Sequence, residues 1–386
     1  MLETIREFGA ELLVAAGEEE ALHQRHTRYF LGLAERAEPW LLTSGQFEWL
    51  ECLETENDNL RAALASSLES RDLETSMRLA SCLWCFWLIY GHVNEGWDHL
   101  STVLAQPGAE DFQLEYAKLK VAAGAVAYFR GDHDRALELC AEGLPLCRAA
   151  GARFHSALAL ALLGGLDYFR GDFDQATSQW EESMALAEEL GNRWLISVLL
   201  PVMGVLALHR GQHERSLDLC RQGLARAREV GENWSINQAL YNAGLAYIGA
   251  RDFGRARSCF LEGLAVSRSL NFYLGISLNL VGLAGIAVAQ GDFERAARLL
   301  GAGDAATIGL RRLNLRLHRP RQRPARGRGK CRGRSAAPGL AGPVSSHGRG
   351  ADVDPACRRG PHHHVLGPPV CARVTLRGGA TAGRTP

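Results

Sequence analysis

One turn signal recurs every forty residues over more than half of the chain, and this period most constrains the fold. The turns begin at residues 91, 131, 171, 211, 251 and 291, with the sequences GHVNEGW, GDHDRAL, GDFDQAT, GQHERSL, RDFGRAR and GDFERAA. A fixed period of about 20–50 residues is typical of repeat proteins, in which each unit buries its apolar face against its neighbours. The spacing therefore predicts an array of like units without insertions.

Small and bulky residues keep the same register within these units. A small residue is followed sixteen positions later by a bulky apolar residue or a cysteine, in the pairs Gly124 and Cys140, Gly164 and Trp180, Gly204 and Cys220, Gly244 and Phe260, and Ala284 and Leu300. Small residues let two antiparallel helices approach closely, and the bulky residue fills the seam with the next pair. Apolar residues between the turns follow the helical period, and Gly-Asp at a turn supplies a helix C-terminus followed by an N-cap. Each unit is thus predicted to be a helical hairpin.

This pattern of small and bulky residues resembles the tetratricopeptide repeat, with about six extra residues per unit. Forty-residue versions resemble the repeat regions of large LuxR-type, ATP-dependent bacterial transcriptional regulators. The resemblance covers residues 91–300. It implies an all-α fold, a right-handed superhelix (α-solenoid) of helical hairpins, which we expect over residues 71–305.

The N-terminal part resembles the helical linker of the same regulators. Residues 49–64, WLECLETENDNLRAAL, and residues 83–92, LWCFWLIYGH, carry this likeness, and residues 2–13, LETIREFGAELL, are similar to the last helix after the ATPase. The resemblance implies that residues 1–70 are a helical linker that follows an NB-ARC-type signal-transduction ATPase. It also implies that this ATPase domain is encoded upstream.

The charges are divided between two segments, although the whole chain has 43 basic and 43 acidic residues. Residues 1–310 hold 26 Lys and Arg against 41 Asp and Glu, whereas residues 311–386 hold 17 against 2. The basic segment has no Phe, Tyr, Trp, Met or Glu, so we expect residues 306–386 to be a disordered tail. Two interpretations remain open: the tail binds DNA electrostatically, or it is an out-of-frame stretch beyond the natural repeats.

No sequence motif for catalysis is found. The chain has no G-x-x-x-x-G-K-[ST] phosphate loop, no G-x-S-x-G and no H-E-x-x-H. Cys82 and Cys85 lie in a strongly apolar stretch without a second C-x-x-C at zinc spacing, so we expect them in the core. The turn histidines His92, His133 and His213 are expected to be solvated. We therefore predict a protein that is not an enzyme, with no catalytic, cofactor-binding or metal-binding residues.

The N-terminal sequence is charged and amphipathic, which does not favour a signal peptide. The most apolar runs, residues 83–90 and 195–208, are shorter than the roughly 18–20 residues that cross a bilayer. Seven cysteines within residues 1–310 suit a reducing compartment. We expect a cytoplasmic protein that does not enter a membrane.

The predicted function is that of a protein–protein interaction scaffold. We expect it to be the sensor portion of a bacterial ATP-dependent transcriptional regulator. In tetratricopeptide stacks the first helix of each hairpin lines a concave groove, where a protein or peptide partner would bind. The groove residues predicted from this rule are Lys118, Tyr128, Tyr168, Val205, Gln238, Tyr241 and Ile248. Apolar surface of this kind usually marks a partner site. The alternative is that tight superhelical coiling covers these side chains.

Overall fold

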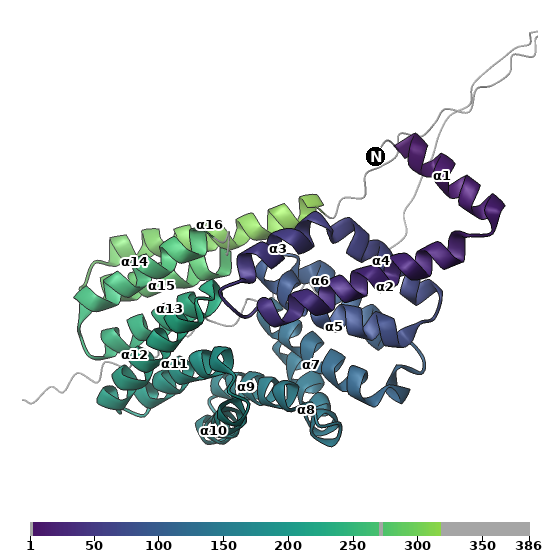
Figure 1. The fold of residues 1–386 in the computed structure, drawn as a ribbon. Helices are drawn as coiled ribbons and strands as arrows, with labels where there is room; N and C mark the ends of the chain where they lie inside the picture. Colours follow the sequence, from purple (N-terminus) through teal and green to yellow (C-terminus); the bar gives the residue numbers. More distant parts are fainter. Residues whose placement is uncertain (1–2, 270–272, 318–386) are drawn as a thin grey trace, which may run out of the picture.

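The computed structural model describes residues 3–269 and 273–317, and this part of the chain is built from helices joined by short turns. The first four are α1 (Glu3–Ala16), α2 (Glu19–Ala37), α3 (Gln46–Thr55) and α4 (Asn57–Glu69), with the 3-10 helix η1 (Glu38–Trp40) after α2. Among the described residues α1 contacts little besides α2, and Figure 1 shows it projecting from the rest. Helices α2 to α4 pack on the start of the array.

Six hairpins follow within the described residues. Their helices are α5 (Leu73–Ile89) and α6 (Val93–Leu104), α7 (Gln113–Arg130) and α8 (His133–Ala149), α9 (Arg153–Arg170) and α10 (Phe173–Glu189), α11 (Arg193–His209) and α12 (His213–Val230), α13 (Asn233–Gly249) and α14 (Phe253–Ser269), and α15 (Tyr273–Ala289) and α16 (Phe293–Leu317). A short 3-10 helix, η2 (Ala109–Asp111), precedes α7. Each hairpin packs on the next, and Figure 1 shows the stack curving from α5 to α16. The predicted all-α solenoid is confirmed.

The repeated turn forms for the reason that the sequence indicates. Gly131, Gly171 and Gly291 have φ between 79° and 84°, the left-handed conformation that ends a helix. The aspartate that follows accepts a hydrogen bond from the backbone N–H three residues on, as in Asp132 to Arg135 at 3.3 Å and Asp172 to Gln175 at 3.2 Å. Each turn therefore ends one helix and starts the next within two residues.

The glycine column sets how closely the two helices of a hairpin approach. A Cβ added at Gly164 would lie 2.5 Å from Nε1 of Trp180, and one added at Gly124 would lie 2.5 Å from Sγ of Cys140. Phe260 occupies the same place over Gly244 and also meets Gly282 of the next hairpin. The bulky column thus fills the seam within each unit, and at Phe260 the seam between units as well.

Helix α16 differs from the expectation at its C-terminal end. It continues to Leu317, beyond residue 305, where we placed the end of the array. Alanine, leucine and arginine are strong helix formers, so the helix can continue although the basic composition has begun. The remainder of the predicted tail, with its proposed DNA contact, lies outside the described residues.

Candidate functional site

Two of the three tyrosines predicted to line the groove, Tyr128 and Tyr168, lie in seams between repeat units. The Tyr128 ring lies 5.8 Å from His133 and 6.1 Å from Phe169 of the next unit, measured between centroids. The Tyr168 ring is surrounded by Phe173, Trp180 and His209, at 5.4–5.9 Å. Burial raises the pKa of both phenols above the usual range. These rings hold one hairpin against the next.

The other predicted groove residues divide into two groups. Val205 and Tyr241 are only 5% and 4% exposed, which leaves little surface for a partner and agrees with the alternative of tight coiling. Gln238 and Ile248 are half-buried on α13. Lys118, half-buried on α7, lines a pocket. Of the seven residues, Lys118 alone lines one of the two pockets described below, and the shared groove stays a prediction.

An irregular segment that the sequence did not single out contacts the array between α12 and α13. Residues 38–46, which we call the strap, run from η1 to the start of α3 and touch the turn between α12 and α13. The Gln46 amide donates to the Leu41 carbonyl oxygen at 2.9 Å and to Glu232 Oε1 at 3.2 Å. A Cβ on Gly231 would lie 3.0 Å from Cβ of Ser44. Residues 186 positions apart are thus joined by a buried hydrogen bond.

Glu232 is the acceptor that holds the strap and the start of α13 together. Its carboxylate accepts hydrogen bonds from the backbone N–H groups of Trp234 and Ser235, at 2.5 and 2.8 Å, as an N-cap does. The side chain is fully buried, and this desolvation raises its pKa although the hydrogen bonds oppose the shift. A glutamate directly after the inter-unit glycine was the only sequence signal for this contact.

Two pockets adjoin the strap, and Glu38 lines both. The first, which we call the acidic pocket, measures about 310 Å³ and is lined by Glu35, Glu38, Glu74, Arg78, Ser81, Cys82, Glu115 and Lys118. The second, which we call the aromatic pocket, measures about 510 Å³. Its lining includes Leu42 of the strap, Trp84 of α5, Phe154 of α9 and Trp194 of α11. Volumes of this size fall in the range of small-ligand and side-chain sites.

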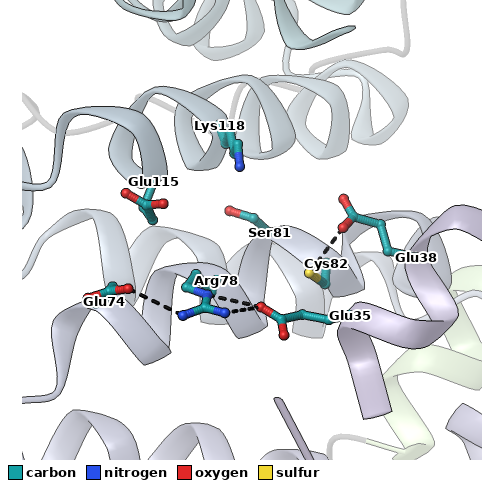
Figure 2. A pocket seen from close by; sticks show the side chains of 8 residues that line it. All are labelled: Glu35, Glu38, Glu74, Arg78, Ser81, Cys82, Glu115 and Lys118. Carbon is teal, nitrogen blue, oxygen red and sulfur yellow. Dashed lines mark hydrogen bonds and ion pairs between the residues drawn. The ribbon is translucent and has the colours of Figure 1, made fainter. Parts of the chain in front are cut away.

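Charged groups of the acidic pocket come from four elements, α2, η1, α5 and α7 (Figure 2). Arg78 on α5 donates to Glu35 of α2 at 2.9 Å and to Glu74 at 3.3 Å. Glu38 accepts from the Cys82 thiol at 3.3 Å, and burial raises the pKa of both groups. A thiol that holds its proton is a poor nucleophile.

Cys82 and Cys85 are both buried in the core, as the sequence predicts. Within residues 3–269 and 273–317, no group of His, Cys, Asp and Glu is arranged to hold a metal ion. In the same described part of the chain, no helix has the length and apolar character needed to cross a membrane.

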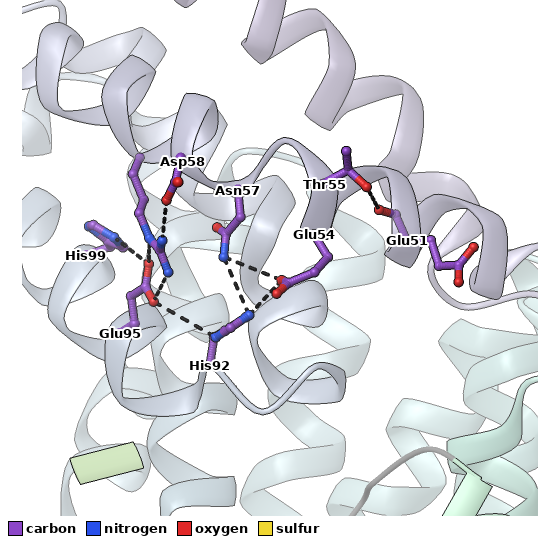
Figure 3. Close-up of polar contacts among 9 residues, drawn as sticks. Glu51, Glu54, Thr55, Asn57, Asp58, His92, Glu95 and His99 are labelled. Atoms are coloured by element: carbon purple, nitrogen blue, oxygen red, sulfur yellow. Dashed lines mark hydrogen bonds and ion pairs between the residues drawn. The ribbon is translucent and has the colours of Figure 1, made fainter. Parts of the chain in front are cut away.

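A polar network joins the linker to the first hairpin (Figure 3). His92 contacts Glu54 at 2.8 Å, and Glu95 pairs with both His99 and Arg61. His92 is only 15% exposed at its side chain, so the expectation that it is a solvated turn residue is wrong. Its partner comes from α3, which lies outside the repeats, so the repeat period gave no sign of it. The network fastens α3 and α4 to α6.

Acid is expected to weaken this network through Glu95. Burial raises the pKa of Glu95, but the hydrogen bonds from His99 and Arg61 outweigh that effect and hold the pKa at about 2. A carboxyl with a lowered folded-state pKa stabilises the fold above its unfolded pKa and loses that contribution as the pH falls. We expect a loss on the order of 2 kcal/mol, allowing for solvent screening, between about pH 5 and pH 2.

Urea denaturation at several pH values tests this expectation. The Glu95→Gln variant should show a flatter pH dependence than the wild type, because its amide does not titrate. Glu110→Gln, at an exposed position before α7, is the matched control and should behave as the wild type. Equal acid sensitivity of Glu95→Gln and the wild type would contradict the assignment.

Comparison with known proteins places the fold. No family model matches the chain. A Rap protein complexed with competence and sporulation factor aligns with a TM-score of 0.54 and 14% identity, over 79% of this chain and 96% of that one. Aspartyl phosphate phosphatase F from Bacillus subtilis aligns with a TM-score of 0.53 and 9% identity, over 78% of this chain and 73% of that one. The fold is that of tetratricopeptide-like helical-repeat proteins.

Sequence comparison shows similarity to a class of transcriptional regulators over part of the chain. Proteins of Mycobacterium bovis and Mycobacterium tuberculosis, named as HTH-type transcriptional regulators, are 35% identical to this chain over 104 residues. That match covers 27% of this chain and 12% of those regulators. The chain therefore corresponds to a small part of the regulators' length.

Proposed function

We propose that this protein is an interaction scaffold that binds a peptide segment of a partner beside the strap. The observation that carries the proposal is the pair of pockets that adjoin residues 38–46 and share Glu38, one charged and one aromatic. Side-chain pockets of contrasting chemistry, spaced along one surface, are how extended peptides are recognised. No catalytic role is proposed.

The solved structures of similar fold support this choice of ligand class. One is titled as a Rap protein complexed with competence and sporulation factor, and another as a Rap conjugation gene regulator in complex with the Phr* peptide. The second aligns with a TM-score of 0.50 and 11% identity, over 74% of this chain and 96% of that one. These titles support peptide binding by an array of this fold; the peptides named there are not assigned to this chain.

We further propose that the scaffold is the sensor portion of a bacterial ATP-dependent transcriptional regulator. Two observations support this finer proposal: the 35% identity to HTH-type regulators, and the resemblance of residues 49–64 to the linker of such proteins. In this arrangement the partner peptide would alter how the linker is held, because α3 and the strap contact both the first hairpin and α13. Peptide binding beside the strap would thereby change the position of the linker, the segment next to the proposed ATPase.

Selection from a randomised peptide library on the full chain tests the scaffold proposal. We expect selected peptides to bind with an affinity that falls about tenfold or more in Phe154→Ala, because this ring lines the aromatic pocket. Isothermal titration calorimetry gives the affinities, and circular dichroism checks that helicity is intact.

The matched control is Phe293→Ala, whose ring is 70% exposed on α16. Its affinity for the selected peptides should equal that of the wild type. The proposal fails if no peptide is enriched, or if Phe293→Ala and Phe154→Ala weaken binding alike.

A further inference from the structure

The acidic pocket carries more negative than positive charge. Four glutamates face one arginine and one lysine around a volume of about 310 Å³. Arg78 is already engaged by Glu35 and Glu74, so its charge is compensated within the wall. Glu115 and Glu38 make no ion pair with any described residue, and the Glu38 carboxylate accepts only from the Cys82 thiol. These two carboxylates are available to a cationic group.

Ser81 adds an observation that is independent of the charges. Ser81 is only 6% exposed, yet its hydroxyl oxygen has no hydrogen-bond partner among the residues that the structure describes. Ser81 lines the pocket, and Figure 2 shows its hydroxyl on the side facing Lys118 of α7 and pointing away from Cys82. Buried hydroxyl groups in folded proteins are nearly always paired. An unpaired one that lines a pocket indicates a place where a ligand group donates or accepts.

Lys118 restricts which cation fits. It approaches the pocket from α7 opposite Ser81, and no described residue pairs with its ammonium (Figure 2). A bare cation would be repelled by it, whereas a cation that carries a carbonyl nearby would give Lys118 an acceptor. An arginine residue has both parts: a guanidinium with five donors in a planar fork, and a backbone carbonyl a side chain away.

We propose that the acidic pocket binds an arginine side chain of the partner peptide, with Glu38, Glu115 and Ser81 around the guanidinium and Lys118 on a peptide carbonyl. The planar fork can donate to several acceptors at once, which a single ammonium does less well. The inference rests on the proposed function for the claim that the arginine belongs to a peptide. The preference of the pocket for the guanidinium stands on the lining residues alone.

The test uses single capped amino acids and the full chain. N-acetyl-arginine amide should bind saturably at millimolar concentration, measured by calorimetry. N-acetyl-citrulline amide, which has the same shape without the charge, should bind about tenfold more weakly or worse, since charge-assisted hydrogen bonds are lost. N-acetyl-lysine amide should fall between them. Equal binding of the citrulline and arginine amides overturns the proposal, as does the lack of saturable arginine binding.

Variants locate the site. Glu115→Gln and Ser81→Ala should each weaken arginine-amide binding several-fold, whereas Glu188→Gln, an exposed glutamate on α10, should leave it unchanged. Unfolding midpoints show whether each variant is folded as the wild type. If Glu188→Gln weakens binding as much as Glu115→Gln, the site is not this pocket.

The two proposals can fail separately. If library peptides bind and depend on Phe154 but the arginine amide does not bind, the scaffold stands and the arginine subsite is wrong. If the arginine amide binds as described but no peptide is enriched, the pocket stands and the peptide-scaffold proposal is wrong.

Discussion

Replacing Trp180 by alanine is expected to lower the free energy of unfolding by about 3–5 kcal/mol. The indole is 3% exposed and packs against Gly164 of the same hairpin, and its Nε1–H donates to the Ala161 carbonyl oxygen at 3.0 Å. The truncation opens a cavity that cannot collapse, since the glycine opposite it has no side chain to fill the space. It also leaves the Ala161 carbonyl without its indole donor.

Chemical denaturation measures the loss, and hydrogen exchange locates it. Because stacked hairpins contact mainly their neighbours, exchange should rise most in α9 to α12 and least in α15 and α16. Trp40→Ala is the matched control: this tryptophan is 50% exposed, and we expect a loss below about 1 kcal/mol. A Trp180→Ala variant as stable as Trp40→Ala would show that the bulky column does not hold the hairpins together.

Replacing Leu41 by aspartate should release the strap. Leu41 is fully buried in the large core cluster, and an aspartate there would place an unpaired charge in apolar surroundings. We expect a loss of about 3 kcal/mol or more. The loss in free energy of unfolding is limited by the free energy with which residues 38–46 dock on the array. Beyond that limit the strap detaches and the aspartate becomes solvated.

This limit makes the distribution of the effect more informative than its size. Hydrogen exchange should rise in residues 38–46 and, through the lost Gln46 contact, at Glu232 and the start of α13. Phe47→Asp, at a side chain that is 64% exposed near the start of α3, is the control and should leave exchange unchanged. Faster exchange in α2 to α5 with no change at α13 would show that the strap does not tie the two regions.

The sequence predicted those parts of the fold that depend on neighbouring units. The turn at Gly131-Asp132 and the approach of Gly164 to Trp180 both follow from residue types at fixed spacing. Such contacts repeat in every unit, so the period reveals them. The confirmed solenoid rests on this local information.

The candidate site could not be predicted in the same way. Tyr128 and Tyr168 lie at helical positions shared by seam residues and groove residues, so periodicity cannot distinguish the two locations. The Gln46 to Glu232 contact occurs once and joins an irregular segment to one particular unit. Of the predicted groove residues only Lys118 lines the acidic pocket, and its pocket neighbours Glu35 and Glu38 come from the linker.

The strap also has a consequence for the order in which the chain folds during synthesis. Gln46 leaves the ribosome 186 residues before Glu232, the group that it binds. At the usual rate of about 5–20 residues per second, that gap lasts roughly 10–40 seconds. During this interval α2 to α11 can fold and bury Leu41 of the strap, while Gln46 still lacks its acceptor Glu232. The hydrogen bond that joins the strap to the start of α13 therefore forms only after the first four hairpins have been synthesised.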